Sequence, residues 1–172
     1  MSLQDDIAAL VKQEAALTLP AFTPDTAWQL GTMLRDMALT RRTPIVVDIR
    51  RFGAPHQQLF YTALAGTTPD NQRWVTRKIA TVARFHKSSY HIGRLLEQSG
   101  LSFSARYNLP EEEYAAHGGC FPLIVENAGI VGAVTVSGLP QRDDHNIVVE
   151  ALCQLTNRDH AALKLPPEAT DN

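Results

Sequence analysis

The first forty residues place apolar side chains at the three- and four-residue spacing of amphipathic helices. This spacing predicts one helix from Ser2 to about Ala16, with Asp5 as the partner of Ser2 in a capping box. A second helix is predicted to begin at Thr23, because a threonine cap followed by proline is typical of a first turn. It should end near Arg41-Arg42, where cations suit the negative end of the helix dipole.

Four shorter apolar runs have the length and the β-branched content of strands. They cover residues 44–49, 58–64, 121–126 and 130–137. The turn-forming segment 51–55 and the loop Asn127-Ala128-Gly129 join them into two hairpins. Because hairpins connect neighbouring antiparallel strands, we expect a mainly antiparallel sheet.

Helical patterns return after each hairpin. The longest extends from about Asp70 to Gln98 and is predicted to bend or break around Ser88-Ser89. A short helix is predicted from Pro110 to His117, closed by Gly118-Gly119, since glycine often follows a helix end. A last helix should start at Pro140.

No repeat or linker divides the chain. We therefore expect one α/β (α+β) domain over residues 1–165, in which helices cover the sheet. Residues 166–172, with Pro166-Pro167, are expected to form a flexible C-terminal tail, and the tail pattern begins at Lys164.

Composition and charge exclude several classes of protein. Hydrophobic residues at 44% and charged residues at 20% are ordinary globular values, and a net charge of −2 argues against a dedicated nucleic-acid binder. The first sixteen residues include four charged ones, so they lack the features of a signal peptide, and no run approaches the roughly 18 apolar residues of a membrane span. We expect a cytoplasmic protein without a membrane partner. Its two cysteines form no CxxC pair.

Three stretches resemble the haem-degrading-like family that includes GlcG, HbpS and the C-terminal domain of PduO. The first is Trp74-Val75-Thr76-Arg77-Lys78 and its continuation to Ser89. The second is His117-Gly118-Gly119-Cys120-Phe121-Pro122. The third is residues 129–145, a strand that ends in Ser-Gly and precedes an acidic helix start.

The resemblance implies a profilin- or PAS-like five-stranded antiparallel sheet flanked by helices, in a homo-oligomer. It also implies haem or a related tetrapyrrole as the candidate cofactor, since members of the wider family bind haem or corrinoid-related partners. The sequence is closest to a cytosolic branch, because it lacks the export signal of the secreted haem-binding members. The resemblance assigns no reaction and no catalytic residue.

Basic side chains of the long helical stretch gather within roughly a third of its circumference, at about 100° per residue. They are Arg73, Arg77, Arg84, Lys87, His91 and Arg94. Such a stripe could bind phosphates, carboxylates or haem propionates. It could equally be a solvated face, or one paired with Glu111 to Glu113.

Lys78 differs from the stripe because it falls near Val82 and Phe85 on the apolar side. Its ammonium could point into a pocket, where it would act as a base or bind an anion. The alternative is a long side chain that keeps its charged end in water.

His117 and Cys120 have H-x-x-C spacing, and His145 could lie close to them if the two strand ends meet. Three such ligands could hold zinc, or His117 alone could hold haem iron. Alternatively, His117 is simply the last residue of a helix, where a cation is favoured by the dipole.

Two turns at strand ends, Gly118-Gly119 and Ser137-Gly138, could form an anion-binding nest near the N-terminus of the last helix. Asp143 and Asp144 at that terminus would oppose an anion, so a structural role for both turns stays open. No P-loop, dinucleotide fingerprint or nucleophile elbow is present. Ser88, Ser89 and Ser137 have no identifiable His–Asp partner, so acyl transfer is not predicted.

Three functions therefore remain open. The first is binding of haem or a similar flat anionic ligand, and the second is a small-molecule enzyme with a pocket around Lys78, His117 and Asp144. The third is a non-enzymatic oligomeric module that recognises another protein. The candidate ligand-binding residues are Arg77, Lys78, Ser88, His117, Gly118, Gly119, Ser137, Gly138, Asp144 and His145. Nucleic acid is the least favoured partner, because no aromatic side chains alternate with the basic stripe.

Overall fold

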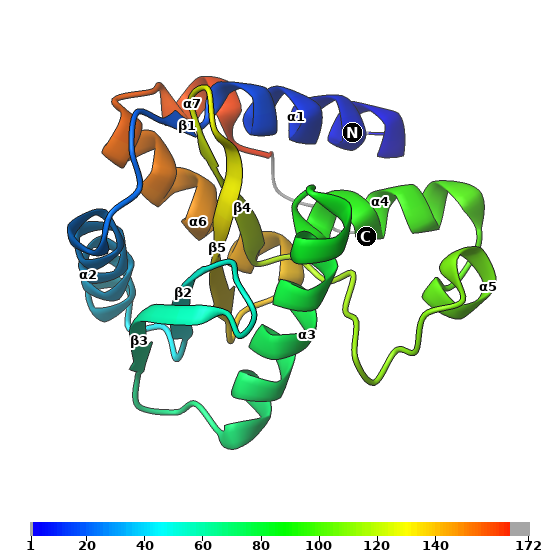
Figure 1. Ribbon diagram of the computed structural model, residues 1–172, viewed down its shortest axis with the longest axis horizontal. Helices are drawn as coiled ribbons and strands as arrows, with labels where there is room; N and C mark the ends of the chain where they lie inside the picture. The colour runs from blue at the N-terminus through cyan, green and yellow to red at the C-terminus, as the bar shows by residue number, and fades with distance from the viewer. Residues whose placement is uncertain (1, 166–172) are drawn as a thin grey trace, which may run out of the picture.

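The computed structural model describes residues 2–165 and contains one five-stranded sheet with helices on both faces (Figure 1). The helices are α1 (Leu3–Ala16), α2 (Pro24–Arg41), α3 (Pro69–Phe85), α4 (Ser89–Ser99), α5 (Phe103–Tyr107), α6 (Gln141–Thr156) and α7 (His160–Leu163). The strands are β1 (Thr18–Leu19), β2 (Val46–Arg51), β3 (Gln57–Ala63), β4 (Cys120–Val125) and β5 (Gly129–Ser137). The expected α+β class is confirmed.

The strand order in the sheet is β1-β4-β5-β2-β3. Both predicted hairpins form, β2 with β3 and β4 with β5, and β2 also pairs antiparallel with β5. The sheet is mainly antiparallel, as expected, and the one parallel pairing lies at its edge, where the two-residue strand β1 runs parallel to β4. Two residues gave too short a pattern to predict a strand.

Helices α2 and α6 cover one face of the sheet and α3 covers the other (Figure 1). The larger core lies under α2 and α6, where Leu30 and Leu34 pack with Val148 and Leu152 against the sheet. On the opposite face, α3 contributes Val75, Ile79 and Val82. This second core is smaller, and it leaves room for a polar side chain of α3 beside the sheet.

The long helical stretch breaks between α3 and α4, as predicted. His86 takes the left-handed conformation with φ of 55°, and the Ser88 side chain accepts a hydrogen bond from the His91 N–H to cap α4. The break separates the basic stripe into two parts. His91 of α4 pairs with Glu14, and Arg94 pairs with Glu97. The stripe is therefore no continuous basic surface.

The predicted helix from Pro110 to His117 is wrong; the short helix of this region is α5, and residues 114–117 are irregular. Only one turn closes within the segment, where the Pro110 carbonyl accepts from the N–H groups of Glu113 and Tyr114, and Ala115 then bonds to α3. The Ala115 N–H donates to the Arg77 carbonyl, and the Ala115 carbonyl accepts from the Thr81 hydroxyl. These long-range bonds replace those of a helical turn. His117 is consequently not a helix-terminal residue.

Helix α1 packs against α4 and α7 at the end of the sheet where β1 lies (Figure 1). The predicted loose segment does not include Leu165, which is buried and whose N–H donates to the side chain of Asn146. The predicted tail at 166–172 lies outside the described residues. None of the described helices combines the length and the apolar character needed to cross a membrane.

Candidate functional site

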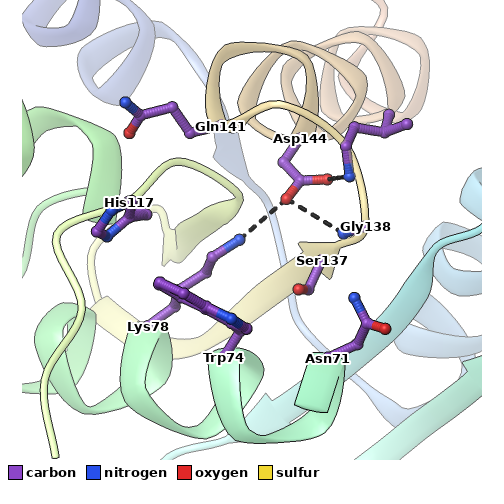
Figure 2. Close-up of a pocket in the computed structure, with 9 residues that line it drawn as sticks. Asn71, Trp74, Lys78, His117, Ser137, Gly138, Gln141 and Asp144 are labelled. Carbon is purple, nitrogen blue, oxygen red and sulfur yellow. Dashed lines mark hydrogen bonds and ion pairs between the residues drawn. The ribbon is translucent and has the colours of Figure 1, made fainter. Parts of the chain in front are cut away.

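A pocket of about 250 Å³ opens between α3 and the start of α6 (Figure 2). It is lined by Asn71, Trp74, Lys78, His117, Ser137, Gly138, Leu139, Gln141 and Asp144. The three residues around which the sequence placed a pocket, Lys78, His117 and Asp144, all lie in it. Ser137 and Gly138, from the predicted strand-end turn, join them.

A buried ion pair between Lys78 and Asp144 forms the floor of this pocket. Lys78 is 3% exposed, and its Nζ lies 3.0 Å from Oδ2 of Asp144 and 3.0 Å from the carbonyl oxygen of Val136. The alternative of a solvated lysine end is thus wrong. A lysine in this small core needs such partners, because an unpaired buried ammonium would be strongly destabilising.

The Asp144 carboxylate also accepts backbone hydrogen bonds. Its Oδ1 accepts from the Leu139 N–H at 2.9 Å, and its Oδ2 accepts a longer bond from the Gly138 N–H at 3.4 Å. Burial raises the pKa of Asp144 above the usual value of an aspartate, while Lys78 and the Leu139 N–H act in the opposite direction. The expected repulsion between Asp144 and a bound anion is therefore reduced, because its charge is already met by three donors.

Gly118 and Gly119, two further candidate residues, lie close to the ion pair and to the start of α6 but do not line the pocket. A Cβ at Gly119 would meet the Val136 carbonyl and would lie 2.7 Å from Nζ of Lys78, and its φ of +121° favours glycine. A Cβ at Gly118 would meet the backbone carbonyl of Gln141. Both glycines therefore allow β4 to approach α6 and Lys78 closely, which is the structural role that the sequence left open.

His117 lies at the rim, with its ring edge-on to Trp74 at a centroid distance of 4.8 Å (Figure 2). Partial burial lowers the pKa of His117, and Lys78 and Arg77 lower it further. These effects favour the neutral form of the imidazole over the charged one. The Arg77 guanidinium lies over the Trp74 ring, 4.5 Å from its centroid, and donates a hydrogen bond to the Glu111 carbonyl. It borders the rim without lining the pocket.

Four lining residues were missed by the sequence reasoning: Asn71, Trp74, Leu139 and Gln141. Asn71, Trp74 and Lys78 have i, i+3, i+7 spacing, which places them on one face of α3. That spacing could have indicated them once Lys78 was considered. Leu139 and Gln141 join the pocket only because the turn before α6 folds over α3.

Two of the candidate residues lie elsewhere. Ser88 is a buried cap whose backbone N–H donates to Glu14, and His145 is buried with its Nε2 2.7 Å from Oε1 of Gln13. Burial lowers the pKa of His145 to about 3. Both residues belong to the contact of α1 with α4 and α6.

The predicted zinc set does not assemble. Cys120 is fully buried, its thiol accepts a hydrogen bond from Thr135, and burial raises its pKa to about 12. Within residues 2–165, no three His, Cys, Asp or Glu side chains gather as metal ligands would. Of His117, Cys120 and His145, only His117 is exposed and could bind a metal as a single ligand.

Known proteins are similar to this chain in sequence and in fold. Residues 22–153 match the family described as haem degrading protein HbpS-like. The chain is 54% identical to a UPF0303 protein of Acidobacterium capsulatum, covering 96% of this chain and 99% of that protein. It is 48% identical to a UPF0303 protein of Paraburkholderia xenovorans, covering 96% and 98%.

Solved structures extend the comparison. The protein Ybr137w superposes with a TM-score of 0.80 at 29% identity, over 91% of this chain and 88% of that one. A complex of PduOC with haem gives a TM-score of 0.65 at 15% identity, over 77% and 94%, and so shares the fold alone. The architecture is that of a helix-flanked five-stranded sheet with a small polar pocket at one end. The chain belongs to the HbpS-like family.

Proposed function

We propose that this protein binds haem or a related anionic tetrapyrrole at the rim of the pocket, with His117 as the ligand of the metal. The observation that carries the proposal is the exposed imidazole of His117 at the mouth of the pocket beside Trp74, and its lowered pKa favours the neutral form. A neutral imidazole nitrogen is a common haem iron ligand. The family description and the haem complex of a protein with this fold support the same ligand.

The pocket fits such a ligand only at its rim. Its volume of about 250 Å³ lies below the roughly 300–1,000 Å³ of pockets that enclose drug-sized molecules. The macrocycle would therefore lie outside the cavity, against Trp74 and the Arg77 side chain. When bound, the iron would supply redox chemistry, while His117 would hold it and Trp74 would shield one edge of the imidazole.

A haemin titration followed by the visible spectrum tests this proposal. We expect a saturable Soret shift at about one haem per chain, and its loss or change in His117→Ala. His86→Asn is the matched control, because His86 is an exposed histidine outside the pocket and asparagine tolerates its left-handed backbone. An unsaturable spectrum, or equal behaviour of all three proteins, would contradict the assignment of His117.

A second candidate, a small-molecule enzyme, is favoured by the buried Lys78–Asp144 pair and the exposed His117 imidazole, which line the same pocket. In that case Lys78 holds an anionic group of the substrate and His117 accepts a proton. Such an enzyme would bind a small ligand inside the pocket without haem, and its rate would follow the ionisation of His117.

We further propose that the protein forms homo-oligomers. The outer edge of β3 pairs with no strand among the described residues, and Tyr61 on it is 45% exposed. Unpaired edges favour association with a second chain. Sedimentation equilibrium checks this directly: a mass of 19.0 kDa at all concentrations would contradict it.

A further inference from the structure

We infer that the interior of the pocket is a binding site for a carboxylate group, presented by a small acid with a short apolar part or by a side arm of a ligand at the rim. The inference deepens the proposed function, since it assigns chemistry to the space beneath His117. It rests on the donors that converge there, none of which depends on a metal.

The Lys78 ammonium has one donor left for a ligand. Two of its three N–H groups point to Val136 and Asp144, each at 3.0 Å. Three of the roughly four acceptor sites of the Asp144 carboxylate are engaged by Lys78 and by the backbone N–H groups of Gly138 and Leu139, so both of its oxygens already accept from donors of the protein. The ion pair therefore offers the pocket a cationic donor more readily than an anionic acceptor.

Ser137 and Asn71 add two neutral donors. Ser137 is 4% exposed, and its hydroxyl has no hydrogen-bond partner in the described part of the chain. Asn71 uses its Oδ1 to accept from the Thr68 N–H, which leaves the amide nitrogen free to donate. Figure 2 shows both groups directed toward the space that Lys78 faces. The Ser137 hydroxyl is not a fully buried unsatisfied atom but faces the pocket, where a ligand or water can accept from it or donate to it.

The remaining lining sets the size and character of the ligand. The volume of about 250 Å³ equals roughly eight waters at about 30 Å³ each, so the site takes a molecule or group of only a few heavy atoms. Trp74 and Leu139 provide apolar walls opposite the donors. The start of α6 adds a partial positive charge. A short carboxylate with a branched or straight apolar end fits the small volume, the apolar walls and the partial positive charge.

Isobutyrate and its neutral isostere isobutyramide test the inference in a Trp28→Phe background. Trp28 is exposed on α2, outside the pocket, so this substitution leaves Trp74 as the only tryptophan to report binding by fluorescence. We expect saturable quenching by isobutyrate and at least about tenfold weaker binding of the amide, because charge-assisted hydrogen bonds are the stronger class. Saturable binding of both probes with equal affinity would overturn the inference.

Asn71→Asp is the decisive variant. Aspartate keeps the oxygen that caps the Thr68 N–H, so the start of α3 stays formed, but it replaces the amide donor with a negative oxygen. Isobutyrate affinity should fall at least about tenfold through like-charge repulsion, with little change in thermal unfolding. Unchanged affinity in a folded Asn71→Asp protein would overturn the inference.

A haemin titration of the same variant separates the two sources of the carboxylate. Haemin binding that weakens in Asn71→Asp, in a protein that binds no isobutyrate, supports a carboxylate site filled by a propionate. Haemin binding that responds to His117→Ala but not to Asn71→Asp, without isobutyrate binding, overturns the carboxylate site and leaves the proposed function standing. Isobutyrate binding without haemin binding supports the carboxylate site and overturns the proposed haem binding.

Discussion

Two buried polar clusters meet at the first turn of α6, and they differ in what they leave unused. One is the pocket with Lys78 and Asp144. The other, which we call the interface cluster, joins α1 to α4 and α6 and consists of Asp6, Gln13, Glu14, His91, Arg142 and His145. Arg142 and His145 are three residues apart and share a face toward α1, whereas Asp144 lies on another face toward α3.

The interface cluster pairs its charges among its own members, and Asp6 also lies 3.9 Å from the guanidinium of Arg94. Both terminal nitrogens of Arg142 donate to Asp6, at 2.8 and 3.0 Å, and Glu14 lies 3.0 Å from Nδ1 of His91. Its one buried side-chain atom without a partner among the described residues is Nδ1 of His145. None of these residues lines the pocket.

The comparison shows that burial of charge does not by itself indicate a ligand site. The pocket cluster is distinguished by donors that remain after the ion pair forms and that face an open space. Among the described residues, the interface cluster lies between packed helices instead, and it attaches α1, which lies outside the matched residues 22–153, to the rest of the fold. We therefore expect substitutions in the two clusters to affect different properties.

The largest effect is expected from Asp6→Ala, which leaves the buried Arg142 guanidinium without its carboxylate. The free energy of unfolding should fall by about 3–5 kcal/mol, the usual cost of breaking a buried ion pair. Chemical denaturation measures this, with the exposed Asp36→Ala as control. If the folded Asp6→Ala protein lost isobutyrate binding while keeping its stability, the proposed separation of the two clusters would be wrong.

His145→Gln should remove a pH-dependent contribution from the same cluster. Burial, then Arg142 and His91, lower the pKa of His145 from 6.5 to about 3. The unfolded chain therefore takes up a proton between these values while the folded protein does not, so stability is lost as pH falls. Between pH 6 and 4, the wild type should lose about 2–3 kcal/mol more than His145→Gln, at about 1.4 kcal/mol per unit. Parallel stability curves for the two proteins would contradict the neutral state of His145.

Gly119→Ala should affect both stability and the pocket. Alanine at this position would have to keep the positive φ of Gly119, and its Cβ would displace the Lys78 ammonium. We expect the free energy of unfolding to fall by about 1–3 kcal/mol. We expect weaker isobutyrate binding as well, measured by Trp74 fluorescence. Gly129→Ala is the matched control, because Gly129 also has a positive φ but a Cβ there would meet no atom within 4 Å. Equal isobutyrate affinity of the two variants would show that Gly119 does not contribute to the binding site.

The smallest effect is expected from Ser137→Ala, which removes one neutral donor. Loss of about 1 kcal/mol corresponds to roughly fivefold weaker isobutyrate binding. Stability should stay the same, because the substitution removes no hydrogen bond within the described part of the protein. Ser104→Ala, in the exposed part of α5, serves as control. A stability loss without a change in affinity would assign Ser137 a purely structural role.

Much of the fold could be predicted from local patterns. Caps at Ser2 and Thr23, the break before α4 and both hairpins follow from side chains that act on their own neighbours in the chain. The error at residues 110–117 has the opposite origin, since Ala115 bonds to residues of α3 more than thirty positions away. Local propensity cannot report such partners.

The sequence by itself determined the helices and strands with strong periodicity, and it indicated Lys78 as a cation on an apolar face. Only the tertiary structure decided that Lys78 forms an ion pair with Asp144. It also decided that His145 and Cys120 are buried outside the pocket that His117 lines. It also decided that Asn71 and Ser137 face the same space. The reason is physical: helix and strand signals arise within a few residues, whereas the pocket depends on how the end of β5, the start of α6 and one face of α3 pack together.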